Sequence, residues 1–70
     1  MMPLIMAAAG ETIVIRKISG KDNVRQHLAD LGFVTDAAIT VINQISGDLI
    51  VQIKGSRIAL DRSMARRIFY

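Results

Sequence analysis

The chain has 70 residues, of which 51% are apolar, and its nine Lys plus Arg against six Asp plus Glu give a net charge of +3. A chain of this length makes one domain, residues 1–70, and buries only about 60% of the surface of its unfolded state. It contains no cysteine, which excludes disulfides and thiolate metal sites and fits a reducing cytosol. The mild positive charge permits an acidic protein, nucleic acid or anionic membrane as partner without requiring any of them.

The first segment, Met1–Ala9, is uncharged and mostly apolar. It is far shorter than the ~20 residues that span a bilayer. Pro3 interrupts the apolar run and no Lys or Arg precedes Ala7–Ala9, so we do not expect a cleaved signal peptide. We expect this segment to lie over the rest of the domain with Leu4 and Met6 packed against it.

The β-branched run Thr12–Ile18 predicts the first strand. Ile13 and Ile15 share one face of such a strand. Ile18 is out of phase with them, so the sequence predicts a β-bulge near Arg16–Lys17.

The stretch Asp22–Gly32 is the only convincing α-helix, because its apolar residues recur at i, i+4 and i+7: Val24, Leu28 and Leu31. Asp22 is expected to cap the first turn with its carboxylate. Gly32 is expected to end the helix in a left-handed conformation, with Phe33 folding back on Leu28. So short a helix is not stable alone in water and must pack on a sheet.

Four more strands follow, with alternating apolar residues that point inward: Ala38–Ile45, Leu49–Lys54, Arg57–Leu60 and Ile68–Tyr70. Hairpin turns are expected at Ser46–Asp48 and Gly55–Ser56. Asp61 is expected to cap one helical turn that runs through Met64–Ala65.

Short strands joined by hairpins predict a sheet that closes on itself. We therefore predict an all-β fold, a small SH3-like β-barrel with one inserted α-helix and a short helical turn before the last strand. The stripe of Val24, Leu28 and Leu31 would plug one open end of the barrel.

No catalytic or metal site can be recognised in the sequence. His27 is the single histidine, and it lies at the edge of the helix stripe without other ligands beside it. Ser19–Lys21 resembles the end of a phosphate-binding loop, but the preceding glycine of that motif is missing. Capping and turn formation account for the aspartates. We predict no enzyme activity, no cofactor and no metal site.

Basic residues fall into two groups: Arg57, Arg62, Arg66 and Arg67 near the C-terminus, and Arg16, Lys17, Lys21 and Arg25 around the first strand and helix. A nucleic-acid surface of this kind would need exposed aromatic side chains for stacking, and few are present. A groove for proline-rich peptides needs aromatic walls that are also missing. A solvated charged face is the simpler interpretation.

Small apolar, glycine and arginine motifs recur in a fixed order over most of the chain: Leu4, Gly10–Glu11, Ile15–Gly20, Arg25–Phe33, Gly47–Val51, Gly55–Leu60 and Ala65–Ile68. This ordered pattern resembles the FeoA family, the small protein A of bacterial ferrous iron transport. Such sequences usually carry Pro-Gly after the helix, where this chain has Thr35–Asp36, and often Pro where it has Leu49. These departures concern loop geometry more than fold.

The resemblance implies an SH3-like barrel without catalysis or a dedicated iron site. It also implies a partner, the FeoB-type membrane transporter of ferrous iron with its cytosolic GTPase domain. The expected location is then cytoplasmic, at the inner membrane through the transporter. The same barrel occurs fused behind metal-dependent DNA-binding repressors.

The favoured hypothesis is a cytosolic adaptor that docks on the transporter and modulates it. A nucleic-acid-binding barrel and a detached regulatory domain of a repressor are the alternatives, and weak self-association stays open. The residues expected to contact a partner are basic or apolar: Arg57, Arg62, Arg66, Arg67, Ile50, Leu4 and Met6.

Overall fold

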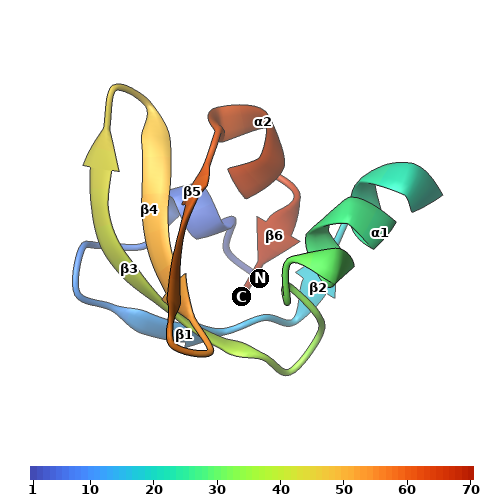
Figure 1. Ribbon diagram of the computed structural model, residues 1–70, viewed down its shortest axis with the longest axis horizontal. Helices are drawn as coiled ribbons and strands as arrows, with labels where there is room; N and C mark the ends of the chain where they lie inside the picture. Colours follow the sequence, from blue (N-terminus) through green and yellow to red (C-terminus); the bar gives the residue numbers. More distant parts are fainter.

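Two antiparallel sheets organise the molecule, and the computed structural model describes all of residues 1–70. The elements in chain order are η1 (Leu4–Met6), β1 (Thr12–Val14), β2 (Lys17–Ile18), α1 (Asp22–Asp30), β3 (Ala38–Ile45), β4 (Asp48–Ile53), β5 (Ser56–Leu60), α2 (Arg62–Ala65) and β6 (Ile68–Phe69). One sheet has the order β1-β3-β4-β5 and the other pairs β2 with β6 (Figure 1). The predicted all-β architecture with one inserted α-helix and a short helical turn before the last strand is confirmed. No helix is long and apolar enough to cross a membrane.

The first predicted strand is in fact two strands that belong to different sheets. Ile15 exchanges backbone hydrogen bonds with the segment before β3, donating to Ala37 at 2.9 Å and accepting from Asp36 at 2.8 Å. The next amide, that of Arg16, donates to the carbonyl of Phe69 at 2.8 Å. Between these two residues the chain therefore leaves the sheet that contains β3 and joins β6. This change of sheet explains why Ile18 is out of phase with Ile13 and Ile15. The expected β-bulge near Arg16–Lys17 is wrong.

Strand β3 has the predicted bounds, and its pairing with β4 shifts register between Val41 and Asn43. The β3–β4 turn consists of Ser46 and Gly47, with φ of 52° and 88°. Positive φ at both central residues is typical of the tight hairpin turns that match the twist of the strands. Asp48 was expected in this turn but begins β4. The next turn likewise lies one residue earlier than predicted, at Lys54–Gly55, where both residues have positive φ.

The end of α1 is confirmed in detail. Gly32 has φ of +103°, its amide donates to Ala29 at 2.9 Å, and the Phe33 amide donates to Leu28 at 2.9 Å. These two bonds form a Schellman ending, which satisfies carbonyls that the helix leaves free.

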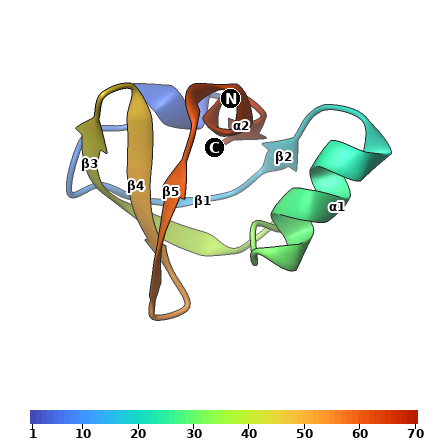
Figure 2. The same ribbon diagram turned by 45° about the horizontal axis from the view of Figure 1, so that its top comes forward.

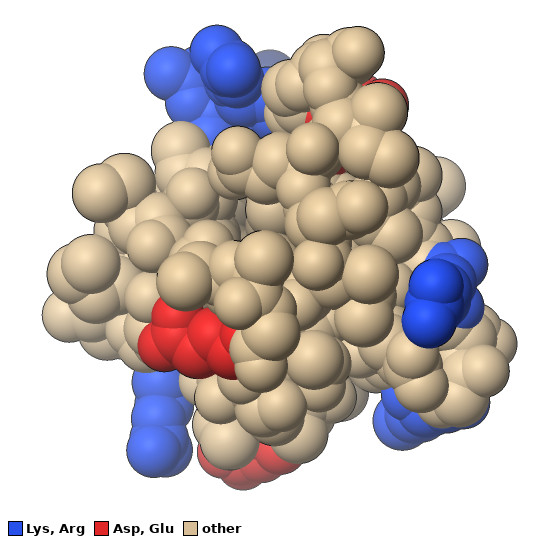
Figure 3. Space-filling view, turned by 90° about the vertical axis from the view of Figure 1, so that its left-hand side faces the viewer, with Lys and Arg blue, Asp and Glu red and all other residues tan.

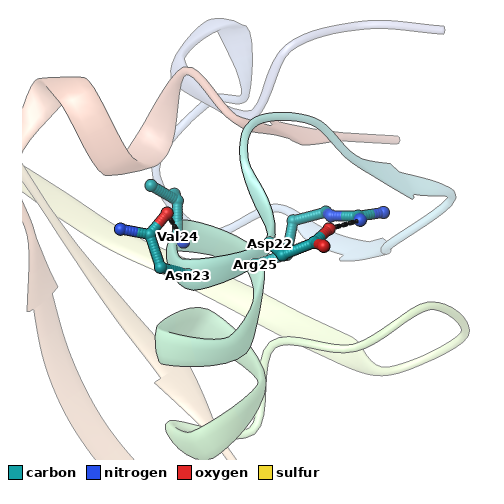
Figure 4. Close-up of polar contacts among 4 residues, drawn as sticks. All are labelled: Asp22, Asn23, Val24 and Arg25. Atoms are coloured by element: carbon teal, nitrogen blue, oxygen red, sulfur yellow. Dashed lines mark hydrogen bonds and ion pairs between the residues drawn. The ribbon is translucent and has the colours of Figure 1, made fainter.

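The start of α1 differs from the prediction. Lys21 is the N-cap residue, and no side chain caps the helix there. The Asp22 carboxylate instead pairs with the Arg25 guanidinium one turn later, while the Asn23 side chain accepts from the Val24 amide at 2.9 Å (Figure 4). The Asp22 carboxylate, which was expected to cap the helix, is therefore used in the ion pair with Arg25.

The core consists of apolar side chains from every layer of the fold: Leu4, Ala7, Ile13, Ile15, Leu28, Phe33, Ile39, Val41, Leu49, Val51, Ile53, Leu60, Ala65 and Ile68. Helix α1 lies beside the four-stranded sheet, next to β2 (Figure 2). Only Leu28 of its stripe is fully buried, and Val24 packs against the core in part. Leu31 is 38% exposed, so the expected three-residue plug is wrong at that position.

The two ends of the chain lie side by side (Figure 1). Met2 and Tyr70 exchange backbone hydrogen bonds of 2.6 and 2.8 Å, and Pro3 forms a bridge with Phe69. Leu4 is fully buried as predicted, whereas Met6 is 63% exposed and does not pack into the core. A 3₁₀ turn explains the difference, because residues two apart in such a turn point in different directions.

Candidate partner-docking surface

Helix α2 presents two of the arginines that the sequence singles out. The Asp61 carboxylate accepts from the Met64 amide at 2.9 Å and from the Ser63 hydroxyl at 2.7 Å, so this predicted cap is confirmed. The hydrogen bond from the Ser63 hydroxyl, followed by that from the Met64 amide, holds the pKa of Asp61 below its ordinary value of 3.8. The cap fixes the single turn that carries Arg62 and Arg66 one above the other.

Arg62 and Arg66 line a hollow of about 230 Å³ together with Ile5, Gln44, Gly47 and Leu49. A terminal nitrogen of Arg62 lies 3.6 Å from the position that a Cβ on Gly47 would take. Neither guanidinium forms an ion pair, since the one salt bridge of the chain joins Arg25 to Asp22. Two exposed cations without an internal partner can attract a carboxylate from another molecule.

The other two arginines of the expected cluster lie elsewhere. The Cδ atom of Arg67 lies 3.5 Å from the position of a Cβ on Gly20, in the loop before α1. Arg57 lies near the β4–β5 hairpin, opposite Gln52, at the end of β5 remote from α2 (Figure 1). The expected group of four is therefore a pair and two separate residues.

The three apolar residues that were expected to contact a partner differ in their exposure and do not form one patch. Leu4 is fully buried and cannot contact a partner in this conformation, and Ile50 is half-buried. Met6 is exposed and lines a second hollow, of about 420 Å³, between the Ile5–Ala9 segment and β3. Sequence reasoning missed this hollow, although the unbroken apolar run around Ala7–Ala9 was a signal for it.

Charged side chains are sparse on that side of the molecule. Figure 3 views the molecule from the side on which β3 and the loop before β1 lie in Figure 1. Most of the face is uncharged, with Lys and Arg at its margin, but acidic side chains also lie on it and at its edge. Glu11, in the loop before β1, is exposed, and its carboxylate accepts from the Ala8 amide at 2.9 Å. A largely uncharged face with basic residues at its border is suited to contact with a protein.

The remaining ionisable groups do not gather into a metal-binding cluster. His27 is exposed on α1, and no three His, Cys, Asp or Glu side chains lie close enough together to hold a metal ion. No polar side-chain atom is buried without a hydrogen-bond partner. The second basic group is exposed around β2 and the start of α1, where Arg25 is already paired.

Fold and surface together define a small SH3-like barrel that carries an arginine pair near a mostly apolar hollow. The model of the FeoA domain matches residues 2–70. The chain belongs to the FeoA family. A protein of Methanocaldococcus jannaschii named Fe(2+) transport protein A is 34% identical over 68 residues, which cover 97% of this chain and 83% of that protein.

Solved structures agree with this assignment. A crystal structure of an iron uptake regulatory protein, FeoA, is similar with a TM-score of 0.88 and 30% identity, over 96% of this chain and 89% of that chain. FeoA of Stenotrophomonas maltophilia, crystallised with zinc and described as a procaryotic SH3 domain protein, has a TM-score of 0.84 at 24% identity, over 99% and 88% of the chains.

The same fold occurs inside larger regulators. A manganese-dependent transcriptional repressor is similar with a TM-score of 0.88 at 22% identity, over 96% of this chain but only 34% of the repressor chain. At this identity the likeness concerns the fold alone.

Proposed function

We propose that this chain is a non-enzymatic accessory protein of ferrous iron uptake that docks on the cytosolic part of a FeoB-type membrane GTPase transporter and modulates it. The observation that carries the proposal is the match to the FeoA domain over residues 2–70, together with 34% identity to a protein named for Fe(2+) transport. In this role the chain resides in the cytoplasm and reaches the inner membrane through the transporter. In this proposal the chain acts by binding the transporter through its surface and catalyses no reaction.

The arginine pair of α2 supports this role. Arg62 and Arg66 are exposed and unpaired beside a largely uncharged face. Apolar contact supplies affinity to such a surface, and arginine supplies steering and forked hydrogen bonds to carboxylates. A chain of 70 residues offers only a small interface, for which we expect micromolar binding, roughly −8 kcal/mol.

The test is a binding titration with the detergent-solubilised transporter encoded in the same genome. The double variant Arg62→Glu/Arg66→Glu should keep the thermal melt of the parent and bind at least tenfold more weakly, ~1.4 kcal/mol. Arg16→Glu/Lys17→Glu, which makes the same charge change near β2, is the matched control and should bind as the parent does. Absence of any binding by the parent chain would refute the proposal.

A second candidate is a regulatory domain of a metal-responsive repressor. The observation behind it is a shared fold, which makes up 34% of the chain of a manganese-dependent repressor. It predicts that the chain contacts the remainder of a repressor and leaves the transporter unbound, so the same titration separates the two candidates.

A further inference from the structure

Two hollows adjoin each other on the largely uncharged side of the molecule, and together they are called the groove. The larger is lined by the Ile5–Ala9 segment and by β3, and the smaller ends at the arginine pair. Ile5 and Gln44 line both hollows, so the two adjoin at these residues. One end of the groove is apolar, with Met6 63% exposed, and the other end is cationic.

One wall of the groove is a strand edge without a partner. Strand β1 pairs with β3 only from Ala38 to Thr40, and the bonds that extend this pairing end at Val41, which donates to Glu11 at 2.9 Å. Beyond it, no hydrogen bond outside the β3–β4 ladder uses the backbone of Asn43, Gln44 or Ile45. This half of β3 therefore has one edge free along the groove.

Gln44 provides the open backbone groups. Ile45 pairs with Asp48 across a two-residue turn, and the residues that close such a turn exchange hydrogen bonds with each other. Because bonding directions alternate along an antiparallel strand, the N–H and C=O of Gln44 point away from β4. The segment Ile42–Ile45 also has no charge and no proline, the usual devices that keep a free edge from pairing.

The groove combines a free strand edge, an apolar part and a cationic end, and these three features together suit one kind of ligand. An extended peptide can add to the edge by main-chain hydrogen bonds and place alternate side chains in the apolar part. A carboxylate on that peptide would meet Arg62 and Arg66, which no acid of this chain neutralises. The complement is therefore an extended segment with apolar residues next to an Asp or Glu.

We propose that the groove between Ile5–Ala9 and β3 binds an extended apolar–acidic segment of the partner protein, which adds as a strand beside Gln44 and anchors its carboxylate on Arg62 and Arg66. This inference rests on the proposed function for the identity of the partner, the FeoB-type transporter. It deepens that function, because it names the mode of contact and the chemistry of the segment.

The probes are overlapping synthetic peptides that span the cytosolic loops and termini of the transporter from the same genome. We expect one peptide with apolar residues and a carboxylate to bind the ¹⁵N-labelled chain, and to slow hydrogen exchange of the Gln44 amide at least tenfold. Gln44→Pro removes that N–H and leaves the β3–β4 ladder intact, so it should weaken binding at least tenfold. Gln44→Ala keeps the N–H and should weaken peptide binding less than Gln44→Pro does.

The arginine end of the groove is tested in the same titration. Arg62→Glu/Arg66→Glu should weaken peptide binding at least tenfold, whereas the control Arg16→Glu/Lys17→Glu should bind the peptide as the parent does.

Each other result has a defined meaning. If the chain binds the whole transporter, but no peptide binds and Gln44→Pro binds the transporter as the parent does, the groove inference is wrong and the proposed function stands. If the parent does not bind the transporter at all, the proposed function fails first. If sedimentation shows a dimer that Gln44→Pro abolishes, a second copy of the chain occupies the edge and the inference is overturned. Gln44→Pro is used only if its melt remains cooperative; otherwise the exchange of the Gln44 amide decides.

Discussion

Gly32 carries a backbone requirement that side-chain contacts do not explain. Its φ of +103° lies in a region that L-residues rarely adopt, whereas a Cβ at this position would meet the nearest atom, Cδ1 of Ile53, at an ordinary 3.6 Å. We expect Gly32→Val to lower the free energy of unfolding by ~1 kcal/mol or more. For a domain of this size, that loss lowers the melting temperature by about 4–8 °C. Gly32→Asn should lose less, because asparagine tolerates positive φ. Equal thermal melts of the two variants would show that Gly32 is not left-handed in solution.

Asp61 gives the chain an acid-dependent helix cap. The pKa of its carboxyl is lowered in the folded state by the Ser63 hydroxyl and the Met64 amide, so the ionised cap adds stability above the ordinary value of 3.8. This contribution decreases as the pH falls below that value and is lost below the folded-state pKa. We expect the parent to melt higher than Asp61→Asn near neutral pH, with the difference vanishing toward about pH 2. A difference that is constant over thermal melts from about pH 7 to about pH 2 would contradict the role of the charge.

At the scale of elements, two leucines of the apolar stripe of α1 differ in burial, and comparing their variants tests whether the helix stabilises the core. Leu28 is fully buried and Leu31 is 38% exposed on the same helix. Leu28→Gln would bury an amide and remove apolar burial, which costs about 3 kcal/mol or more, a large part of the ~5 kcal/mol typical of so small a domain. Leu31→Gln should melt close to the parent. If denaturant unfolding gives both variants the same stability, α1 does not contribute to the core through Leu28.

The elements that the sequence predicts well are those whose signals are local. The end of α1 depends on Gly32 and Phe33 alone, and the cap of α2 depends on Asp61 and the next three residues, so both could be predicted. The Asp22 cap failed because Arg25 competes for the same carboxylate. The split between β1 and β2 was visible only as a phase error at Ile18, since the second partner, β6, lies about 50 residues away in the sequence.

The candidate surface was predictable only in part for the same reason. Arg62 and Arg66 are four residues apart, and helical spacing brings them together. Arg57 and Arg67 are near them in sequence, but strand direction and the return of the chain to β6 take them away. The groove combines Ile5–Ala9 with a free edge of β3, and such a pairing of distant segments leaves no periodic signal in the sequence.

At the scale of the whole molecule, the inventory of side chains argues against an iron site on this chain. Ferrous iron in proteins commonly takes two histidines and a carboxylate on one face, and here one exposed histidine stands without two further ligands beside it. We expect anaerobic calorimetry with Fe(II) to show no stoichiometric binding to the monomer. His27→Ala should behave identically in the same titration. A submicromolar site that is lost in His27→Ala would refute this prediction.

The charge distribution of the whole molecule also predicts how the chain treats nucleic acid. The net charge is +3, and the candidate docking surface has only two unpaired arginines in one place, Arg62 and Arg66. Each phosphate neutralised contributes about 0.9 to the slope of log K against log salt, so this pair supports a slope of about −2 at most. We expect fluorescence anisotropy with a duplex of about 20 base pairs to show weak binding of that slope, which falls about 16-fold between about 50 and 200 mM salt. Binding to the transporter, which also uses apolar contact, should persist across that range. A slope of about −6 or steeper that Arg62→Glu/Arg66→Glu removes would instead favour the nucleic-acid alternative, because so many released counterions require an extended phosphate contact.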